Sequence, residues 1–190
     1  MKNNYNQFMN KQNILFFDMD GTLVDTDYAN YLAYQQSIEI VIGRKNMVEV
    51  NDKNRFDKSM LINFYPNLTT DEYNSIVNTK GNLYEQFLSE TKLNDKLANT
   101  LYEAANNHKT VLVTNANKAR SLLTLKHHGI VDYFNHLFFG EDVIRSHGKY
   151  ENAILSLGVK PDEVVIFENE YKEIYQAKNI GFSNNNIVHI

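Results

Sequence analysis

A short stretch near the start of the chain, Ile14 to Asp25, constrains the fold more than any other part of the sequence. It reads ILFFDMDGTLVD. Its leading apolar run is long enough for a buried strand and too short for a helix. The Asp-x-Asp-Gly that follows ends the strand, because Asp and Gly favour turns. Asp18 and Asp20 therefore come at the carboxyl end of a buried strand, where open α/β sheets place their ligands.

This pair of carboxylates predicts a cation site. On a strand, Asp18 and Asp20 point to the same side. Two like charges this close need a cation or a shared proton. A hard ion such as Mg²⁺, held by carboxylate oxygens and by a substrate phosphate, meets that need. Taken alone, the pair also fits a strand end followed by a solvated turn. The two interpretations are distinguished by whether the rest of the chain supplies matching site residues.

Composition excludes several classes of protein and partner. The chain has 190 residues, 43% hydrophobic and 22% charged, which is ordinary for a globular protein with one core or a core and an inserted domain. Its net charge of −4 argues against nucleic acid and anionic membranes as partners. With no cysteine, disulfides and thiolate catalysis are excluded. We expect a flexible tail over residues 1–12, no membrane span and a cytoplasmic location.

The segment after the first strand is predicted to be all-helical. Apolar residues at helical spacing predict a helix over residues 27–42, with Gly43 as its stop. Residues 44–53 are polar and predict a loop. A second short helix is expected before Pro66, and Thr69 with Glu72 reads as the capping box of a third. We assign residues 26–92 to an inserted helical domain.

From residue 93 onward, short apolar runs alternate with helical patterns. The runs predict strands at residues 110–114, 136–140, 163–167 and 187–190, with helices between them and one over residues 93–105. This alternation predicts a parallel sheet covered by helices on both faces. The predicted fold class is therefore α/β: a three-layer, Rossmann-like parallel sheet core over residues 13–25 and 93–190, with the all-helical cap inserted.

Three further strand ends carry candidate site residues. Thr114, Asn115 and Ala116 precede a helix, where free N–H groups bind phosphate, although Thr114 or Asn115 could simply cap that helix. Lys149 opens another helix, where the macrodipole disfavours a cation; it could neutralise a phosphate or be an ordinary solvated lysine. Two acidic residues and an amide follow the fourth strand, and they are either metal ligands or a charged loop: Glu168, Asn169 and Glu170.

Together these motifs resemble the four motifs of the haloacid dehalogenase superfamily of phosphotransferases, in the same order and each at a strand end. The helical insert falls where the phosphoglycolate phosphatase and β-phosphoglucomutase-like branch carries its cap. Two positions depart from the family pattern. Tyr150 stands where the third motif usually has proline, and Asn169 stands where the fourth usually has a metal-binding aspartate.

The resemblance implies a Mg²⁺-dependent phosphomonoester hydrolase. Asp18 would attack phosphorus and form an aspartyl-phosphate, and Asp20 would act as general acid and base. Thr114 and Lys149 would hold the phosphoryl group. The implied metal ligands are Asp18, Asp20, Asn169, Glu168 and Glu170. Residues expected near the substrate are Gly21, Thr22, Asn115, Ala116 and, from the cap, Asn30, Arg44 and Arg55.

Other functions stay open at this stage. The expected substrate is a small phosphorylated metabolite, and the expected assembly a monomer or weak homodimer. A phosphomutase on the same fold is the first alternative, although a histidine that mutases carry near position 30 is absent. The second is a low-activity phosphate-binding or regulatory protein, because Asn169 lacks the charge of an aspartate. Asp20 favours phosphate esters over carbon–halogen bonds, since dehalogenases of the family lack it.

Overall fold

The structure, a computed structural model, describes residues 14–43, 56–144 and 147–190. The chain divides into two compact units, one formed by residues 1–24 and 93–190 and the other by residues 25–92. We call the first the α/β unit and the second the helical unit. In the described ranges, no helix is both long enough and apolar enough to cross a membrane. The predicted role of the helical unit as a cap stays a prediction.

The α/β unit is built on a five-stranded sheet in the order β5-β4-β1-β6-β7, with all neighbouring strands parallel. The strands are β1 (Ile14–Phe17), β4 (Thr110–Val113), β5 (His136–Phe138), β6 (Val164–Glu168) and β7 (Ile187–His189). Phe17 at the end of β1 aligns with Leu112 on β4 and with Phe167 on β6. The residues that follow these three strands therefore meet at one edge of the sheet.

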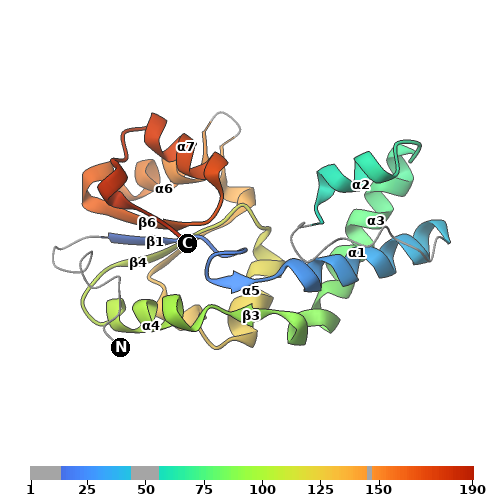
Figure 1. Ribbon diagram of the computed structural model, residues 1–190, viewed down its shortest axis with the longest axis horizontal. Coiled ribbons are helices and arrows are strands. Elements are labelled where there is room, and N and C mark those ends of the chain that lie inside the picture. Colours follow the sequence, from blue (N-terminus) through green and yellow to red (C-terminus); the bar gives the residue numbers. More distant parts are fainter. Residues whose placement is uncertain (1–13, 44–55, 145–146) are drawn as a thin grey trace. The chain divides into compact units, whose positions relative to one another are not determined.

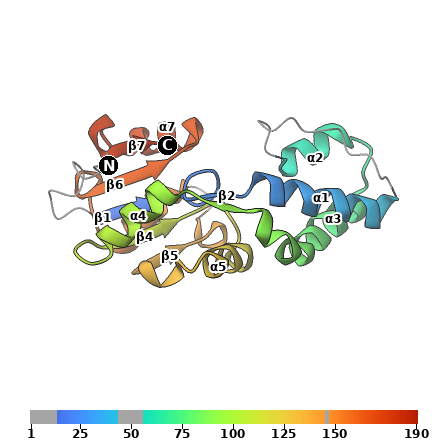
Figure 2. The same cartoon turned by 60° about the horizontal axis from the view of Figure 1, so that its bottom comes forward.

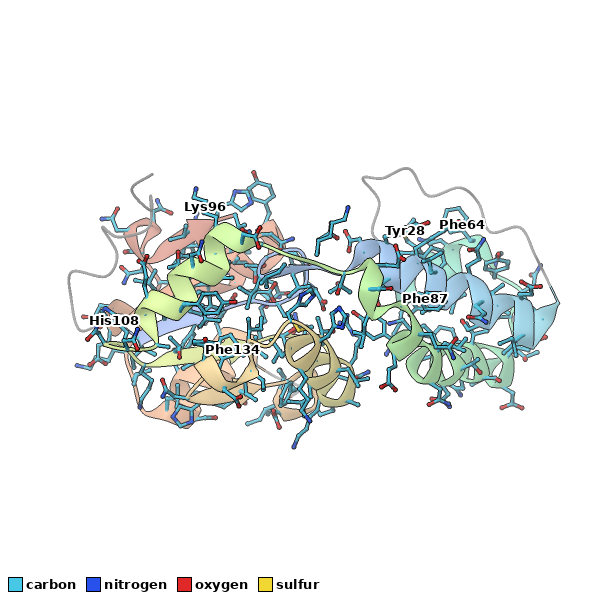
Figure 3. The ribbon with its side chains drawn as sticks, turned by 90° about the horizontal axis from the view of Figure 1, so that it is seen from below. Tyr28, Phe64, Phe87, Lys96, His108 and Phe134 are labelled. Atoms are coloured by element: carbon cyan, nitrogen blue, oxygen red, sulfur yellow. The ribbon has the colours of Figure 1, made fainter. Side chains whose placement is uncertain are left out.

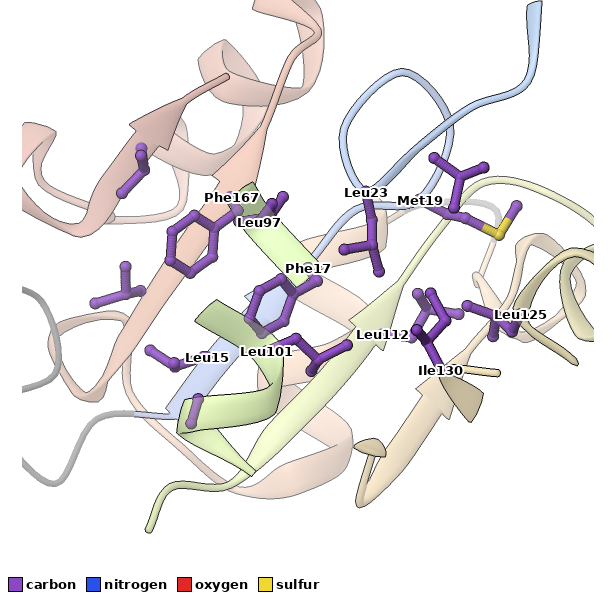
Figure 4. Close-up of a cluster of buried hydrophobic side chains, with 14 of the residues drawn as sticks. Leu15, Phe17, Met19, Leu23, Leu97, Leu101, Leu112, Leu125, Ile130 and Phe167 are labelled. Atoms are coloured by element: carbon purple, nitrogen blue, oxygen red, sulfur yellow. The ribbon is translucent and has the colours of Figure 1, made fainter. Parts of the chain in front are cut away.

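Helices cover both faces of this sheet, which confirms the predicted three-layer fold (Figure 1). Helices α4 (Asp95–Ala104) and α5 (Lys118–His127) pack on one face, and α6 (Lys149–Leu157) and α7 (Tyr171–Asn179) on the other. On the α4 face the rings of Phe17 and Phe167 stack with centroids 4.8 Å apart (Figure 4). Because β1, β4 and β6 are buried on both sides, their sequences are continuous apolar runs.

The helical unit contains α1 (Asp27–Ile42), α2 (Lys58–Phe64) and α3 (Thr70–Leu83), followed by a 3₁₀ segment over Tyr84–Glu90. Its core gathers apolar side chains from all three helices and from Phe56. Two aromatic side chains of this unit are exposed, Tyr28 near the start of α1 and Phe64 at the end of α2 (Figure 3). The predicted first helix and the Thr69–Glu72 capping box are confirmed. The predicted loop over residues 44–53 lies outside the described residues.

Two very short strands were not anticipated. β2 (Val24–Asp25) and β3 (Lys92–Leu93) pair where the chain passes between the units (Figure 2). The expectation that a helix begins at residue 93 was wrong, because Leu93 is in β3 and α4 begins at Asp95. The physical start signal is Asn94, whose side-chain oxygen accepts a hydrogen bond from the Leu97 N–H at 3.2 Å. A two-residue strand is too short to show a period of its own.

The backbone of Gly140 lies close to the backbone of Asn115 in the loop after β4, and a substitution at Gly140 tests this contact. A Cβ atom on Gly140 would lie 2.4 Å from the carbonyl oxygen of Asn115, and neither backbone can move without shifting the loop after β4. We expect Gly140→Ala to lower the free energy of unfolding by about 1–3 kcal/mol, measured by urea denaturation. Gly81→Ala is the control, because a Cβ there meets no atom within 4 Å and should stabilise α3 by about 0.5–1 kcal/mol. Wild-type stability in Gly140→Ala would contradict the packing described.

Candidate active site

Asp18 lies directly after β1 at the carboxyl edge of the sheet. Its backbone N–H continues the strand pairing by donating to the Phe167 carbonyl at 3.1 Å. Its carboxylate is almost fully buried and is held on both oxygens. Lys149 Nζ lies 2.6 Å from Oδ1, and the Thr22 hydroxyl lies 2.9 Å from Oδ2. The structure thus fixes the orientation of this carboxylate with one cation and one hydroxyl.

Lys149 is shared between two carboxylates. Its ammonium also lies 2.7 Å from Glu168 Oε2, at the end of β6, and its side chain is 2% exposed. The Tyr150 hydroxyl donates to the same Glu168 oxygen at 2.7 Å. The other Glu168 oxygen accepts the N–H groups of Asn169 and Glu170, each at 2.8 Å. Glu168 therefore has both oxygens occupied within the protein and fixes the turn after β6.

Burial and charge act against one another in this cluster. Burial raises the pKa of Asp18 to about 6, although the neighbouring Lys149 ammonium opposes that rise. Burial disfavours the charge on Lys149, but the Asp18 and Glu168 carboxylates outweigh it and raise the pKa of that amine above its usual value. Burial and Glu168 also raise the pKa of Tyr150, so its phenol keeps the proton that it donates. Lys149 is therefore a permanent cation beside Asp18.

The turn after Asp18 brings Thr22 and Asn169 together. The Met19 carbonyl accepts hydrogen bonds from three successive N–H groups of this turn. Gly21 has a φ of 77° there, and a Cβ on it would lie 2.4 Å from the Asn169 side-chain nitrogen. Only glycine combines this backbone conformation with the close approach of Asn169. The Thr22 hydroxyl lies 2.9 Å from Asn169 Oδ1 as well as from Asp18 Oδ2.

Thr114 follows β4 at the same edge of the sheet. It is buried, and its hydroxyl oxygen accepts the Ala116 N–H at 3.1 Å. Within the described ranges its hydroxyl donates to no protein group, so the proton is available to a ligand oxygen. Asn115 is exposed and Ala116 is buried. One of the backbone N–H groups in the first turn of α5 already has a partner, because the Glu141 carboxylate accepts the Lys118 N–H.

The second aspartate of the pair has a partner that the sequence analysis missed. Arg120 Nη1 donates to Asp20 Oδ1 at 2.9 Å, and Nη2 contacts Oδ2, so the guanidinium holds both carboxylate oxygens. The two side chains are 11% and 5% exposed. Arg120 lies in the first turn of α5, where the helix dipole disfavours a cation. Arg120 carries the same sequence signal as Lys149, a cation in the first turn of a helix.

The oxygens facing Thr22 fit a hard cation. The Thr22 hydroxyl has one proton and can donate it to only one of Asp18 Oδ2 and Asn169 Oδ1 at a time. Two oxygen acceptors therefore converge with one proton between them, and both are donor types that Mg²⁺ accepts. No group of three acidic, histidine or cysteine side chains suited to a metal occurs among the described residues. A metal held here would thus rely on one carboxylate, from Asp18, and on the neutral amide of Asn169.

The remaining predicted site residues are Glu170, Asn30, Arg44 and Arg55. Glu170 stands at the N-cap position of α7, and its backbone N–H donates to Glu168 Oε1. Asn30 is buried within the helical unit, where its amide contacts the Thr26 hydroxyl at 3.2 Å and Lys80 Nζ at 2.6 Å. Arg44 and Arg55 lie outside the described residues. The predicted roles of Glu170, Asn30 and Arg44 in binding metal or substrate stay predictions.

Comparisons with known proteins agree with this picture. The family model described as haloacid dehalogenase-like hydrolase matches residues 15–185. The chain is 24% identical over 196 residues to the glyceraldehyde 3-phosphate phosphatase of Pyrococcus furiosus, covering 91% of this chain and 79% of that protein.

Solved structures share the fold at low sequence identity. One is a predicted phosphoglycolate phosphatase from Haemophilus somnus, with a TM-score of 0.77 and 19% identity over 95% of this chain and 86% of that one. Another is CbbY from Rhodobacter sphaeroides in complex with phosphate, with a TM-score of 0.76 and 17% identity over 90% and 84% of the two chains. At these identities the likeness concerns the fold.

Proposed function

This chain belongs to the haloacid dehalogenase-like hydrolases, and we propose that it hydrolyses the phosphate ester of a small metabolite with Mg²⁺ as cofactor. The observation that carries the proposal is the buried Asp18 carboxylate held by Lys149 at the carboxyl edge of a parallel sheet. A carboxylate beside a permanent cation is a nucleophile in a site suited to an anionic substrate. The phosphatase activity named for the Pyrococcus relative supports the same reaction.

In the proposed first step, an Asp18 oxygen attacks phosphorus and the bond from phosphorus to the ester oxygen breaks. The phosphoryl group is then bound to Asp18, and the leaving oxygen takes a proton from Asp20, which enters this step as the carboxylic acid and not as the carboxylate paired with Arg120. Lys149 and the Thr114 hydroxyl bind the phosphoryl oxygens, where negative charge is spread. When bound, Mg²⁺ would supply positive charge that offsets the phosphoryl charge, and Asp18 and Asn169 would hold it.

In the proposed second step, water attacks the phosphorus of the aspartyl-phosphate. Asp20, now ionised, accepts a proton from that water, and the bond from phosphorus to the Asp18 oxygen breaks. Inorganic phosphate leaves the site, and the Asp18 carboxylate is regenerated. Lys149 then returns to its contact with Asp18, as the structure shows it. The predicted cytoplasmic location, and a monomer or weak homodimer, remain part of the proposal.

We predict that Asp18→Asn abolishes Mg²⁺-dependent phosphate release, because an amide is a poor nucleophile at phosphorus. The loss should be at least about 10³-fold in kcat, measured by phosphate release from p-nitrophenyl phosphate and from a panel of metabolite phosphates. The control is Asp132→Asn, the same chemical change at an exposed position of the α/β unit, which should retain wild-type rates. Undiminished release by Asp18→Asn would rule out Asp18 as the nucleophile.

A phosphate-binding protein of low activity is the second candidate, and one observation favours it. The three carboxylates of the site already have two cations beside them, Arg120 on Asp20 and Lys149 shared by Asp18 and Glu168, so little negative charge is left to attract a metal. In that case the protein would bind phosphate but release little product. Weak metal binding at Asn169 would then limit the reaction.

Asn169→Asp tests this second candidate. A carboxylate at position 169 adds a negative charge beside Asp18, so we expect lower stability without metal and a larger rise in Tm with Mg²⁺ than in the wild type. The measurement is the Tm of both proteins over a series of Mg²⁺ concentrations, with phosphate release in parallel. Asn185→Asp, at an exposed position, controls for the added charge. If Mg²⁺ shifts the Tm of Asn169→Asp no further than that of the wild type, the metal does not bind at this residue.

A further inference from the structure

Tyr150, the second residue of α6, places a hydroxyl inside an otherwise apolar cluster. The residue is 2% exposed, and its ring lies against those of Phe16 and Phe182, each with centroids 6.4 Å away. A phenylalanine would make the same ring contacts without burying a hydroxyl, which costs free energy unless the hydroxyl is hydrogen-bonded. Packing alone therefore does not account for the hydroxyl of Tyr150.

This hydroxyl completes the set of donors around the Glu168 carboxylate. Glu168 Oε1 accepts two backbone N–H groups, whereas Oε2 contacts the Tyr150 hydroxyl and the Lys149 ammonium, each at 2.7 Å. Lysine is a weak anchor for Oε2, because it carries its charge on a flexible stem of four carbons. The Tyr150 ring is packed in the core, so its hydroxyl holds Oε2 in one place.

The place of Glu168 Oε2 decides where Lys149 can bind a ligand. An ammonium has three protons. Asp18 Oδ1 at 2.6 Å and Glu168 Oε2 at 2.7 Å account for two of them, and the third has no oxygen or nitrogen acceptor among the residues that the structure describes. Because the N–H bonds of an ammonium are arranged tetrahedrally, fixing two acceptors fixes the direction of the third proton. A shift of Oε2 would redirect the proton that is left for a phosphoryl oxygen.

We propose that Tyr150 is a positioning residue: through Glu168, its hydroxyl keeps the Lys149 ammonium directed at the phosphoryl group of the substrate. The inference rests on the proposed function for turnover, but phosphate binding tests it without turnover. The proline that the resembled motif usually carries at this position has no hydroxyl to donate. If the Tyr150 hydroxyl only stabilised the fold, its loss would lower the free energy of unfolding and leave the affinity for phosphate unchanged.

The first test is Tyr150→Phe, which removes the hydroxyl and keeps the ring. We expect the Kd for inorganic phosphate, measured by calorimetry with Mg²⁺ and well below the Tm of the variant, to rise about tenfold, as the loss of one hydrogen bond to a charged group would give. The control is Tyr102→Phe, the same change at a half-buried tyrosine of α4 on the opposite face of the sheet, which should leave this Kd unchanged. Wild-type phosphate affinity in Tyr150→Phe overturns the inference.

A double-mutant cycle tests whether Tyr150 acts through Glu168. Glu168→Gln keeps the size of the side chain and an oxygen for the turn after β6, but it puts an NH₂ group where Oε2 accepted both donors. Adding Tyr150→Phe to Glu168→Gln should then change the phosphate Kd by less than about twofold. A further loss as large as in the wild-type background would show that Tyr150 acts by another route and would overturn the inference.

Hydrolysis of p-nitrophenyl phosphate and of metabolite phosphates by the same proteins separates this inference from the proposed function. If the wild type binds phosphate but hydrolyses none of the esters, and Tyr150→Phe binds phosphate about tenfold more weakly, the phosphatase proposal fails and the role of Tyr150 stands. If the wild type hydrolyses the esters and Tyr150→Phe keeps its phosphate affinity, only the role of Tyr150 fails. A wild type that binds no phosphate contradicts both.

Discussion

The contact of one buried ammonium with two buried carboxylates is the interaction on which the site depends. Lys149 joins Asp18 after β1 to Glu168 at the end of β6, and it comes from the first turn of α6. Removing Lys149 would leave two buried carboxylates without their cation, and breaking a buried pair in this way costs about 3–5 kcal/mol in proteins. The cluster therefore ties two strands and a helix together at the edge where the proposed reaction would take place.

The carboxylates of the whole site are likewise largely offset by cations of the protein. Three carboxylates face two fixed cations, and Asp18 is the one with an oxygen directed at the Thr22 hydroxyl beside Asn169. Such a site attracts a dication less strongly than one rich in free carboxylates. It also presents two cations to an anionic substrate. The balance between metal binding and anion binding is thus shifted toward the anion, and the neutral amide of Asn169 shifts it further.

Much of the core could be predicted from the sequence because parallel strands buried on both faces are short, continuous apolar runs. Once the strand ends were known, the parallel register was enough to bring Asp18, Thr114 and Glu168 to one edge. The contacts made across the fold were not predictable. Nothing local to Tyr150 indicates that its hydroxyl binds Glu168, and nothing local to Asn30 indicates that it contacts Lys80. Arg120 was within reach of the dipole argument, but its partner was not.

The most direct test of the central claim is to look for the covalent intermediate on Asp18. The enzyme is mixed with Mg²⁺ and phosphoglycolate, quenched in acid during turnover, digested, and its peptides are analysed by mass spectrometry. The mechanism predicts that the peptide containing Asp18 carries one phosphoryl group, and that the Asp18→Asn protein treated in the same way carries none. Rapid turnover with the phosphoryl group on another residue, or on none at any quench time, would contradict the role of Asp18 as nucleophile.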